Sequence, residues 1–439
     1  MKIMYSRRGY LLYCAVMTWP LSTFGEKLSA PTGINELMRD LGSATSGRND
    51  LLMLGGGNPA HIPEVEAVWR SRWDSIAANG DEMERLLGNY DGPQGNPDFL
   101  DAMASSLRTR FGWDVTAANL AVVNGSQTAF FYLFNMLAGR FSDRPSRRIL
   151  LPLTPEYIGY ADQGISPRLF QAFPPRVELL GDHRFKYRID FDRLVIDRDT
   201  AAICVSRPTN PSGNVLTDDE VAHLEGLAGR HNIPLLIDNA YGAPFPGILF
   251  NDIQPTWTDN SVLVMSLSKL GLPGARTGII LAREDLIESL AALNAVAGLA
   301  NGNLGPYIAT PLLRDGTLYE LSRKVIRPFY QRKSEQAVRW LTEALDPSLP
   351  YRIHANEGAL FLWLWLDGLP ITAEELYHRL KRRNVLVIPG HYFFFGLDQE
   401  HEHQHRCLRL SYAMQESTVQ RGIAIIADEV AKAYRGEGG

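Results

Sequence analysis

The sequence predicts an α/β fold, in which a large domain has a mostly parallel central sheet covered by helices and a smaller domain is α+β. Three observations lead to this prediction. Short apolar segments alternate with helical patterns from about residue 118, polar turn-forming clusters follow these segments, and the pattern changes after about residue 310. A chain of 439 residues is also long for one hydrophobic core, which favours two domains.

The apolar segments of the large domain are expected to be buried strands. They are "NLAVV" (119–123), "RRILLPL" (147–153), "AAICVS" (201–206), "IPLLID" (233–238) and "SVLVMS" (261–266). Between them, residues 128–139 have a helical pattern that ends in glycine, and Thr217 with Glu220 forms the capping-box pattern of a helix start. Fully apolar strands that alternate with helices indicate a parallel sheet covered on both faces.

The C-terminal part of the chain has a different pattern, which predicts the second domain. A long helical stretch at 316–345 leads to the apolar run "ALFLWLWL", and Thr372 with Glu375 marks another helix start before two short strands and a final helix. The predicted divisions are an N-terminal segment that packs with the small domain, a large domain and a small domain, at residues 17–60, 61–310 and 311–439.

The first sixteen residues form a separate feature. "MKIMYSRRGYLLYCAVM" has a basic start and a short apolar stretch, like a signal peptide, but no clear cleavage site follows. The apolar stretch is also too short to cross a bilayer. We therefore expect residues 1–16 to be an upstream extension and Met17 to be the true start.

Composition and charge exclude several classes of protein. The chain is 45% hydrophobic and 21% charged, and its net charge of −5 comes without any block of basic residues. This disfavours nucleic acid and anionic membranes as partners. The three cysteines have no metal-ligand spacing, so we expect no metal site, free thiols and a reducing, cytoplasmic location.

Two other motifs have ordinary explanations. "LLMLGGGNPA" at 51–60 partly matches a dinucleotide-binding fingerprint, but prolines stand where the phosphate-binding helix would begin. "HEHQH" at 401–405 is typical of a solvated polar loop rather than of a metal site. The sequence contains no P-loop and no Gly-x-Ser-x-Gly motif.

The polar residues that follow the strands are the candidates for function. On sheets of this kind, ligands bind beyond the carboxyl ends of the strands. Taken alone, Asp238, Asn210 and Ser126 are ordinary turn or cap residues. Lys269 is less ordinary, because it comes directly after a buried strand, and a buried ammonium is costly unless it is neutralised or paired.

Taken together and in this order, these residues resemble the class I and II aminotransferases, fold-type I enzymes that use pyridoxal 5′-phosphate. The resemblance extends from about Phe24 to the C-terminus. It rests on the following stretches: "MLGGGNPA", "NYDGPQG", "NGSQTAFFYLFN", "PEYIGYAD", "SRPTNPSGNV", "IDNAYGAPFPGI", "MSLSKLGLPGARTGI", "EGALFLWLW" and "CLRLSYA". One departure is that Arg276 follows Lys269 by seven residues, where many relatives have eight, which implies a tighter loop.

The resemblance implies three catalytic residues and a set of cofactor contacts. Lys269 would bind the cofactor as a Schiff base and move the proton at the substrate Cα, and Asp238 would pair with the pyridine nitrogen. Tyr241 and Asn210 would bond the phenolic oxygen, and Tyr157 would stack on the ring. The residues implied in phosphate binding are Gly125, Ser126, Gln127, Ser266 and Arg276.

The resemblance also implies how substrate and subunits are arranged. Arg409 would bind the substrate carboxylate as a bidentate pair, with Asn210 beside it, and Gly57 would let the backbone come close to that carboxylate. The protein would be a homodimer with shared active sites, because Tyr90, five residues before Gly95, resembles a tyrosine that related enzymes send into the neighbouring subunit's phosphate site.

The implied activity is amino-group transfer between L-valine, or a similar aliphatic amino acid, and pyruvate, in amino-acid biosynthesis. The products would be 3-methyl-2-oxobutanoate and L-alanine. An alternative is other fold-type I chemistry, such as β-elimination of a cysteine conjugate, which Lys269 and Asp238 would serve equally well. A transcriptional regulator built on this fold is disfavoured, because no basic recognition helix precedes it. The sequence does not rank valine against isoleucine, leucine or 2-aminobutyrate.

Overall fold

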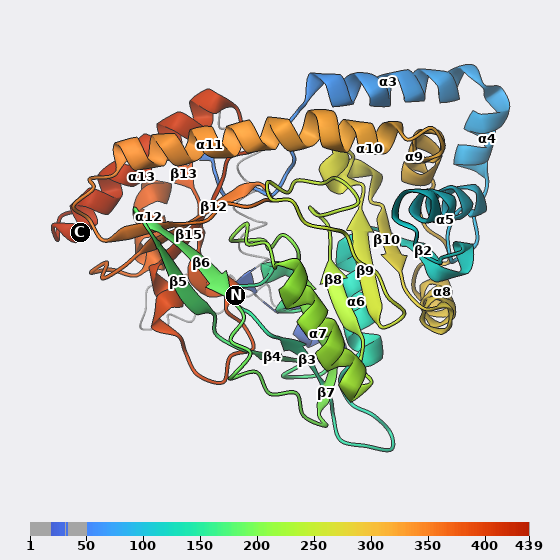
Figure 1. Cartoon of the computed structure of the whole chain (residues 1–439), viewed down its shortest axis with the longest axis horizontal. Helices are drawn as coiled ribbons and strands as arrows, with labels where there is room; N and C mark the ends of the chain where they lie inside the picture. Colours follow the sequence, from blue (N-terminus) through green and yellow to red (C-terminus); the bar gives the residue numbers. More distant parts are fainter. Residues whose placement is uncertain (1–18, 31, 34–50, 439) are drawn as a thin grey trace.

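The computed structural model describes residues 19–30, 32–33 and 51–438 (Figure 1). The extension predicted at residues 1–16, Met17 and Cys14 lie outside the described residues, as does much of the predicted 17–60 segment. Within the described ranges, every helix is too short or too polar to cross a membrane. Cys204 and Cys407 are buried free thiols.

A seven-stranded sheet forms the centre of the large domain, in the order β2-β10-β9-β8-β7-β3-β4. From β9 to β4 all neighbours are parallel, whereas β10 is antiparallel to both of its neighbours, so the predicted α/β fold with a mostly parallel sheet is confirmed. The strands are β2 (Leu120–Val123), β3 (Arg148–Leu151), β4 (Phe170–Ala172), β7 (Thr200–Ser206), β8 (Leu235–Asp238), β9 (Ser261–Ser266) and β10 (Gly278–Leu281).

The antiparallel β10 was not among the predicted strands. It follows β9 after residues 267–277, which contain only two short 3₁₀ turns. Leu267 N donates to Thr277 O, so the chain turns straight back on itself. A parallel neighbour would need a longer crossover connection, usually a helix.

Both faces of this sheet are buried, as the apolar strands predict. Alternate residues of β8 belong to different core clusters: Leu235 and Ile237 pack on the side of α7, and Leu236 packs on the side of α6. The capping box at Thr217 is present, since Glu220 N donates to Thr217 Oγ1 at 3.1 Å and Thr217 N donates to Glu220 Oε2 at 2.8 Å. The helices of this part are α3 (Pro63–Ala78), α4 (Gly80–Gly88), α5 (Pro97–Phe111), α6 (Ser126–Leu137), α7 (Asp218–His231), α8 (Glu284–Gly298) and α9 (Leu304–Arg314).

A six-stranded sheet forms the second unit, in the order β14-β15-β12-β11-β6-β5. Its strands are β5 (Arg176–Gly181), β6 (Arg184–Arg188), β11 (Tyr351–His354), β12 (Phe361–Leu366), β14 (Ile388–Pro389) and β15 (Cys407–Ser411). Because β5 and β6 lie inside the 61–310 range, the predicted division at residue 310 does not separate the two sheets. The reason is a long-range parallel pairing of β6 with β11, which no local pattern reveals.

Two connections join the N-terminal and central parts of the chain to this unit. β1 (Leu52–Met53) pairs in parallel with β13 (Val385–Leu386) in a separate two-stranded sheet, two residues before β14 in the chain. The predicted helical stretch at 316–345 is α10 (Thr317–Leu321), a π-helical turn (Ser322–Ile326) and α11 (Arg327–Ala344), which runs above both sheets in Figure 1. The π turn comes just before Pro328, whose ring nitrogen cannot donate to the preceding turn. The remaining helices are α1 (Thr23–Ser29), α12 (Ala373–Arg382) and α13 (Glu416–Tyr434).

Candidate active site

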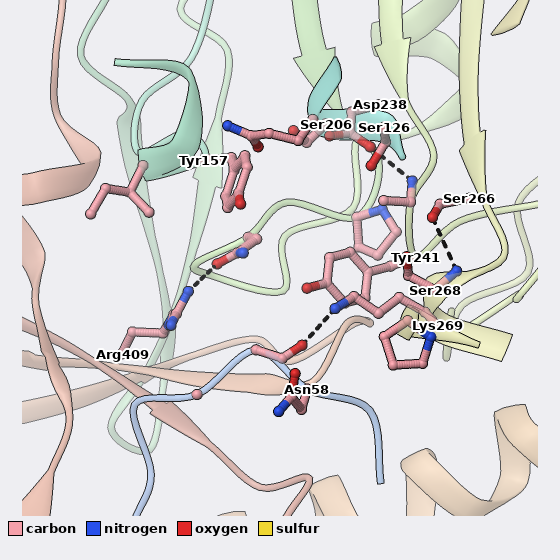
Figure 2. A pocket seen from close by; sticks show the side chains of 18 of the residues that line it. Asn58, Ser126, Tyr157, Ser206, Asp238, Tyr241, Ser266, Ser268, Lys269 and Arg409 are labelled. Atoms are coloured by element: carbon pink, nitrogen blue, oxygen red, sulfur yellow. Dashed lines mark hydrogen bonds between the residues drawn. The ribbon is translucent and has the colours of Figure 1, made fainter. Parts of the chain in front are cut away.

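A cavity of about 760 Å³ lies beyond the carboxyl ends of β7, β8 and β9 (Figure 2). Its position is the one expected for a ligand on such a sheet. Most of the predicted site residues line it, although they come from distant parts of the chain. Those residues are Gly57, Ser126, Gln127, Tyr157, Asn210, Asp238, Tyr241, Ser266, Lys269, Arg276 and Arg409.

Lys269 reaches into the cavity from the 3₁₀ turn that follows β9. Its Nζ donates to Gly57 O at 2.5 Å and stands 5.2 Å from the centre of the Tyr241 ring. Burial, followed by the charges of Arg409 and Arg276, lowers the pKa of Lys269 from 10.5 to about 8, while the charge of Asp238 acts in the opposite direction. The lysine is therefore prepared to act as a neutral amine near neutral pH.

Asp238 ends β8 and presents its carboxyl group at the cavity wall (Figure 2). The Tyr160 hydroxyl donates to Oδ2, and Ala240 N donates to Oδ1 at 2.8 Å. Burial raises the pKa of Asp238, whereas these two hydrogen bonds and the charge of Lys269 lower it. An oriented carboxylate in this position suits a protonated ring nitrogen of a ligand.

The first turn of α6 and Arg276 form a cradle for an anion. Gly125 precedes the helix with a φ of +87°, and a Cβ at this position would lie 2.1 Å from Nη2 of Arg276. The guanidinium therefore lies directly against the helix start, where the N–H groups of the first turn have no partner within the helix. Ser126, Gln127 and Ser266 line the same part of the cavity. This set of donors fits a phosphate group.

Arg409 is a buried cation on β15, with 3% of its surface exposed. Its Nη1 donates to Asn210 Oδ1 and its Nη2 to Gly55 O, both at 2.7 Å, and its guanidinium stands 4.2 Å from the centre of the Phe361 ring. Burial lowers the pKa of Arg409 from 12.5 to about 10. Among the described residues no carboxylate pairs with it, and its Nε has no partner. A buried guanidinium without a counter-ion is suited to bind a carboxylate ligand.

Two tyrosines complete the walls of the cavity. In Figure 2 Tyr157 stands on the side of Arg409, and Tyr241 stands beside Lys269. Burial raises the pKa of both phenols, so both hydroxyls are neutral at physiological pH. Each can therefore donate a hydrogen bond to a ligand, and each ring can pack against one.

Tyr90 is the one predicted site residue that lies away from this chain's cavity. It follows α4, and 84% of its surface is exposed. Gly125 adjoins the cavity through the Arg276 contact without being part of its lining. That Tyr90 serves a neighbouring subunit's site stays a prediction.

Other residues of the site were missed by the sequence analysis. Tyr160, which holds Asp238, stands three residues after Tyr157 in "PEYIGY", and this spacing in a short 3₁₀ turn could have identified it. The apolar residues of the cavity wall could not be recognised from the sequence, because apolar residues of the hydrophobic core follow the same pattern. They include Leu51, Met53, Phe130, Ile158, Pro208 and Met414.

Comparisons with known proteins agree with this geometry. A family model described as "Aminotransferase class I and II" matches residues 73–426. The chain is 47% identical over 415 residues to a valine–pyruvate aminotransferase of Escherichia coli, which covers 94% of this chain and 98% of that protein.

Solved structures show the same likeness. A putative amino-acid aminotransferase from Psychrobacter arcticum has a TM-score of 0.93 at 44% identity, with 95% of this chain and all of that chain covered. A valine–pyruvate aminotransferase from Salmonella typhimurium has a TM-score of 0.85 at 47% identity, with 92% and 100% covered. Because the family model spans most of the chain and the relatives of 44–47% identity cover nearly all of it, the chain belongs to the class I and II aminotransferase family, and it is an aminotransferase.

Proposed function

We propose that this aminotransferase uses pyridoxal 5′-phosphate to transfer the amino group of L-valine, or a similar aliphatic amino acid, to pyruvate. The products are 3-methyl-2-oxobutanoate and L-alanine. The observation that carries the proposal is that one cavity combines the lysine of lowered pKa, the anion cradle and a buried arginine that has no carboxylate partner in the part of the chain that the structure describes. The two valine–pyruvate aminotransferases to which the chain is 47% identical support the choice of substrates.

The cofactor fits the donors of this cavity. Arg276, Ser266 and the first N–H groups of α6 would hold its phosphate, and Asp238 would keep its ring nitrogen protonated. Tyr157 would pack on the ring, and Tyr241 with the Asn210 amide would bond its phenolic oxygen. When bound, the cofactor supplies an electron sink for negative charge at the substrate Cα.

The protein's own residues supply binding, orientation and proton transfer. Arg409 would bind the substrate carboxylate, and its own direction is set by Asn210 and Gly55 O. Lys269, as a neutral amine, would form the covalent link to the cofactor and later take the proton from Cα. Gly57 holds Lys269 Nζ through its carbonyl group, next to the place proposed for the substrate.

A test of the activity is a screen of amino donors and 2-oxo acids on the purified protein. Valine and pyruvate are expected to give 3-methyl-2-oxobutanoate and alanine in equal amounts. Release of pyruvate and ammonia from a cysteine conjugate, without an acceptor, would favour β-elimination instead. The further proposal of a cytoplasmic location rests on the ordinary composition and the buried free thiols.

Aliphatic donors are expected to be better substrates than acidic ones. Part of the cavity wall is apolar and includes Leu51, Met53, Ile158 and Met414. Among the described residues, the cations that line the cavity are Lys269, Arg276 and Arg409, and each already has a proposed role. A side-chain carboxylate of aspartate or glutamate would then be buried without a partner, which is costly. The measurement is kcat/KM for each donor at fixed pyruvate, and a higher value for aspartate or glutamate than for valine would contradict this prediction.

The proposed assembly is a homodimer in which Tyr90 completes the partner's phosphate site. Tyr90 is exposed, and so are Val296 and Leu299 on the segment that binds residues 89–95. The two segments are tied together, since Asn294 Nδ2 donates to Pro93 O at 2.8 Å. Exposed apolar side chains on two segments that are bonded to each other support a surface that a second copy covers.

Complementation of two inactive variants tests the shared site. Tyr90→Ala and Lys269→Ala are prepared separately, unfolded, mixed and refolded. In a mixed dimer one site receives Lys269 from one chain and Tyr90 from the other, so activity is expected well above that of either parent. A charge-assisted hydrogen bond to the phosphate is worth about 1.5–3 kcal/mol, which sets the expected defect of Tyr90→Ala.

Refolded single variants are the control for this experiment. Mixed dimers that form but show no recovery, together with an impaired Tyr90→Ala parent, would place Tyr90 in its own subunit's site or outside the site. A wild-type protein that is monomeric and fully active would exclude sharing altogether.

A further inference from the structure

A second buried carboxyl group lies behind the cavity wall, one residue before Tyr157. Glu156 is 2% exposed. Its Oε1 accepts a hydrogen bond from Ser206 N at 2.9 Å, and its Oε2 lies 2.6 Å from Ser206 Oγ. Ser206 ends β7 and is the register partner of Asp238 on β8. Two carboxyl groups therefore meet at the same end of two adjacent strands.

Glu156 also connects three parts of the site. Tyr157 N donates to Glu156 Oε2 at 3.2 Å, so the carboxyl group contacts the backbone of the tyrosine that lines the cavity. Glu156 N donates to Phe393 O at 2.9 Å, and the Phe393 ring lies 5.2 Å from the guanidinium of Arg409. Glu156 thus contacts the loop with Tyr157, the end of β7 and the segment that contains Phe393.

The surroundings of Glu156 disfavour a negative charge on it. The titratable groups around it are Asp238 of β8, Tyr160 of the 3₁₀ turn and Cys204 of β7. Among the described residues no cation forms an ion pair with it, whereas Asp238 has Lys269 nearby and the Tyr160 hydroxyl as a donor. Burial raises the pKa of Glu156 from 4.5 to about 8, and the charge of Asp238 adds to this effect, while the Ser206 hydrogen bonds oppose it. Two buried carboxylates at one site cannot both ionise easily.

We propose that Glu156 is a positioning residue that works as a neutral carboxylic acid. Its hydrogen bonds hold Tyr157 and the end of β7 in place, and its neutrality leaves Asp238 to carry the negative charge that faces the cavity. The catalytic part of this inference rests on the proposed function, because there Tyr157 and Asp238 contact the cofactor ring. The charge state of Glu156 does not depend on that function.

The first test compares Glu156→Gln, Glu156→Ala and the control Glu343→Gln, which changes an exposed glutamate of α11. Glutamine is uncharged like the neutral acid, its carbonyl can accept from Ser206 N and its amide can donate to Ser206 Oγ, so the longer bond from Tyr157 N to Oε2 is the one bond that it cannot replace. At pH 7 we expect Glu156→Gln to stay within about threefold of wild type in kcat/KM, whereas Glu156→Ala loses about tenfold or more and retains the cofactor less well. Cofactor retention is measured by dialysis and visible absorbance.

The second test uses the protein without cofactor and needs no activity. A folded-state pKa of about 8, against 4.5 as the ordinary value, means that the unfolded chain releases the proton of Glu156 first. Wild type therefore loses stability as the pH rises from about 4.5 to about 8, and glutamine removes this loss. The melting-temperature advantage of Glu156→Gln over wild type is expected to grow between pH 5.5 and pH 8, roughly the span over which the proton is lost. Glu343→Gln should show no such growth.

Either of two results overturns the proposal. If Glu156→Gln is as impaired as Glu156→Ala, the neutral form is not the working one. If its melting difference from wild type does not change with pH, Glu156 is not neutral in the folded protein. A wild-type protein without transaminase activity would instead count against the proposed function, and the melting series would still report the charge state of Glu156.

Discussion

Replacing Lys269 with alanine is expected to abolish transamination while the chain still folds. In the proposed mechanism Lys269 is both the amine that would link the cofactor and the base that would move the Cα proton, so turnover of the variant should fall by about four orders of magnitude or more. The visible absorbance of the lysine-bound cofactor should be lost as well. At pH 7 a pKa of about 8 leaves about one tenth of the wild-type side chains neutral, compared with well below one thousandth at 10.5. Initial rates with valine and pyruvate, and absorbance spectra, provide the measurement.

A second expected result concerns the stability of Lys269→Ala. Because the pKa of Lys269 falls from 10.5 to about 8 on folding, the unfolded chain binds the proton more strongly. The resulting destabilisation grows as the pH falls from about 10.5 to about 8, and it is fully present below that. Alanine removes it, so the variant without cofactor should melt no lower than wild type at pH 7. Lys324→Ala, an exposed lysine in the π turn, is the control and should keep full activity. An active, normally coloured Lys269→Ala protein would refute the assignment.

Replacing Arg409 with alanine is expected to weaken the use of both amino acids and 2-oxo acids. The substrate carboxylate would then be buried without its cation, and loss of one partner of such a pair costs about 2–5 kcal/mol. This corresponds to a decrease in kcat/KM of about thirtyfold or more for valine and for pyruvate. The oxygens of Asn210 and Gly55 would also lose the donor that each has now.

An amine without a carboxylate separates this role from general damage. Isobutylamine has the side chain of valine and no carboxylate, so its slow reaction should change little in Arg409→Ala. Arg406→Ala is a matched control, because Arg406 lies three residues earlier and binds Glu402 and Ile371 O instead of lining the cavity. If isobutylamine lost as much rate as valine, Arg409 would not be the carboxylate-binding residue.

Local patterns of the sequence were sufficient for five strands of the large domain and for the helices that follow β2 and β7. Thr217 and Glu220 are three residues apart, so their capping box depends only on the chain near them. Likewise, Asp238 and Lys269 were recognised because each follows a fully apolar strand. The class I and II aminotransferase family could be predicted from the sequence because the nine stretches that resemble it are each continuous in the chain and can be read without the structure.

The same local patterns did not show the contacts between distant segments. β6 joins the second sheet through a pairing with β11, and β10 runs antiparallel because its connection to β9 is short. The hydrogen bond from Arg409 to Asn210 joins residues that are 199 positions apart. Tyr160 and Glu156 were not predicted as site residues, because their roles depend on hydrogen bonds to Asp238 and Ser206, which lie on strands far from them in the sequence.

The sequence by itself determined five strands of the central sheet, the helix starts at Thr217 and Thr372, the family, and the residue types that stand at the ends of those strands. The tertiary structure alone decided which of those residues share one cavity, that Arg409 has no carboxylate partner among the described residues, and that Lys269 has a pKa of about 8. The physical reason is that burial and Coulomb interactions depend on distances in space. Residues far apart in the chain acquire those distances only when the sheets form and pack.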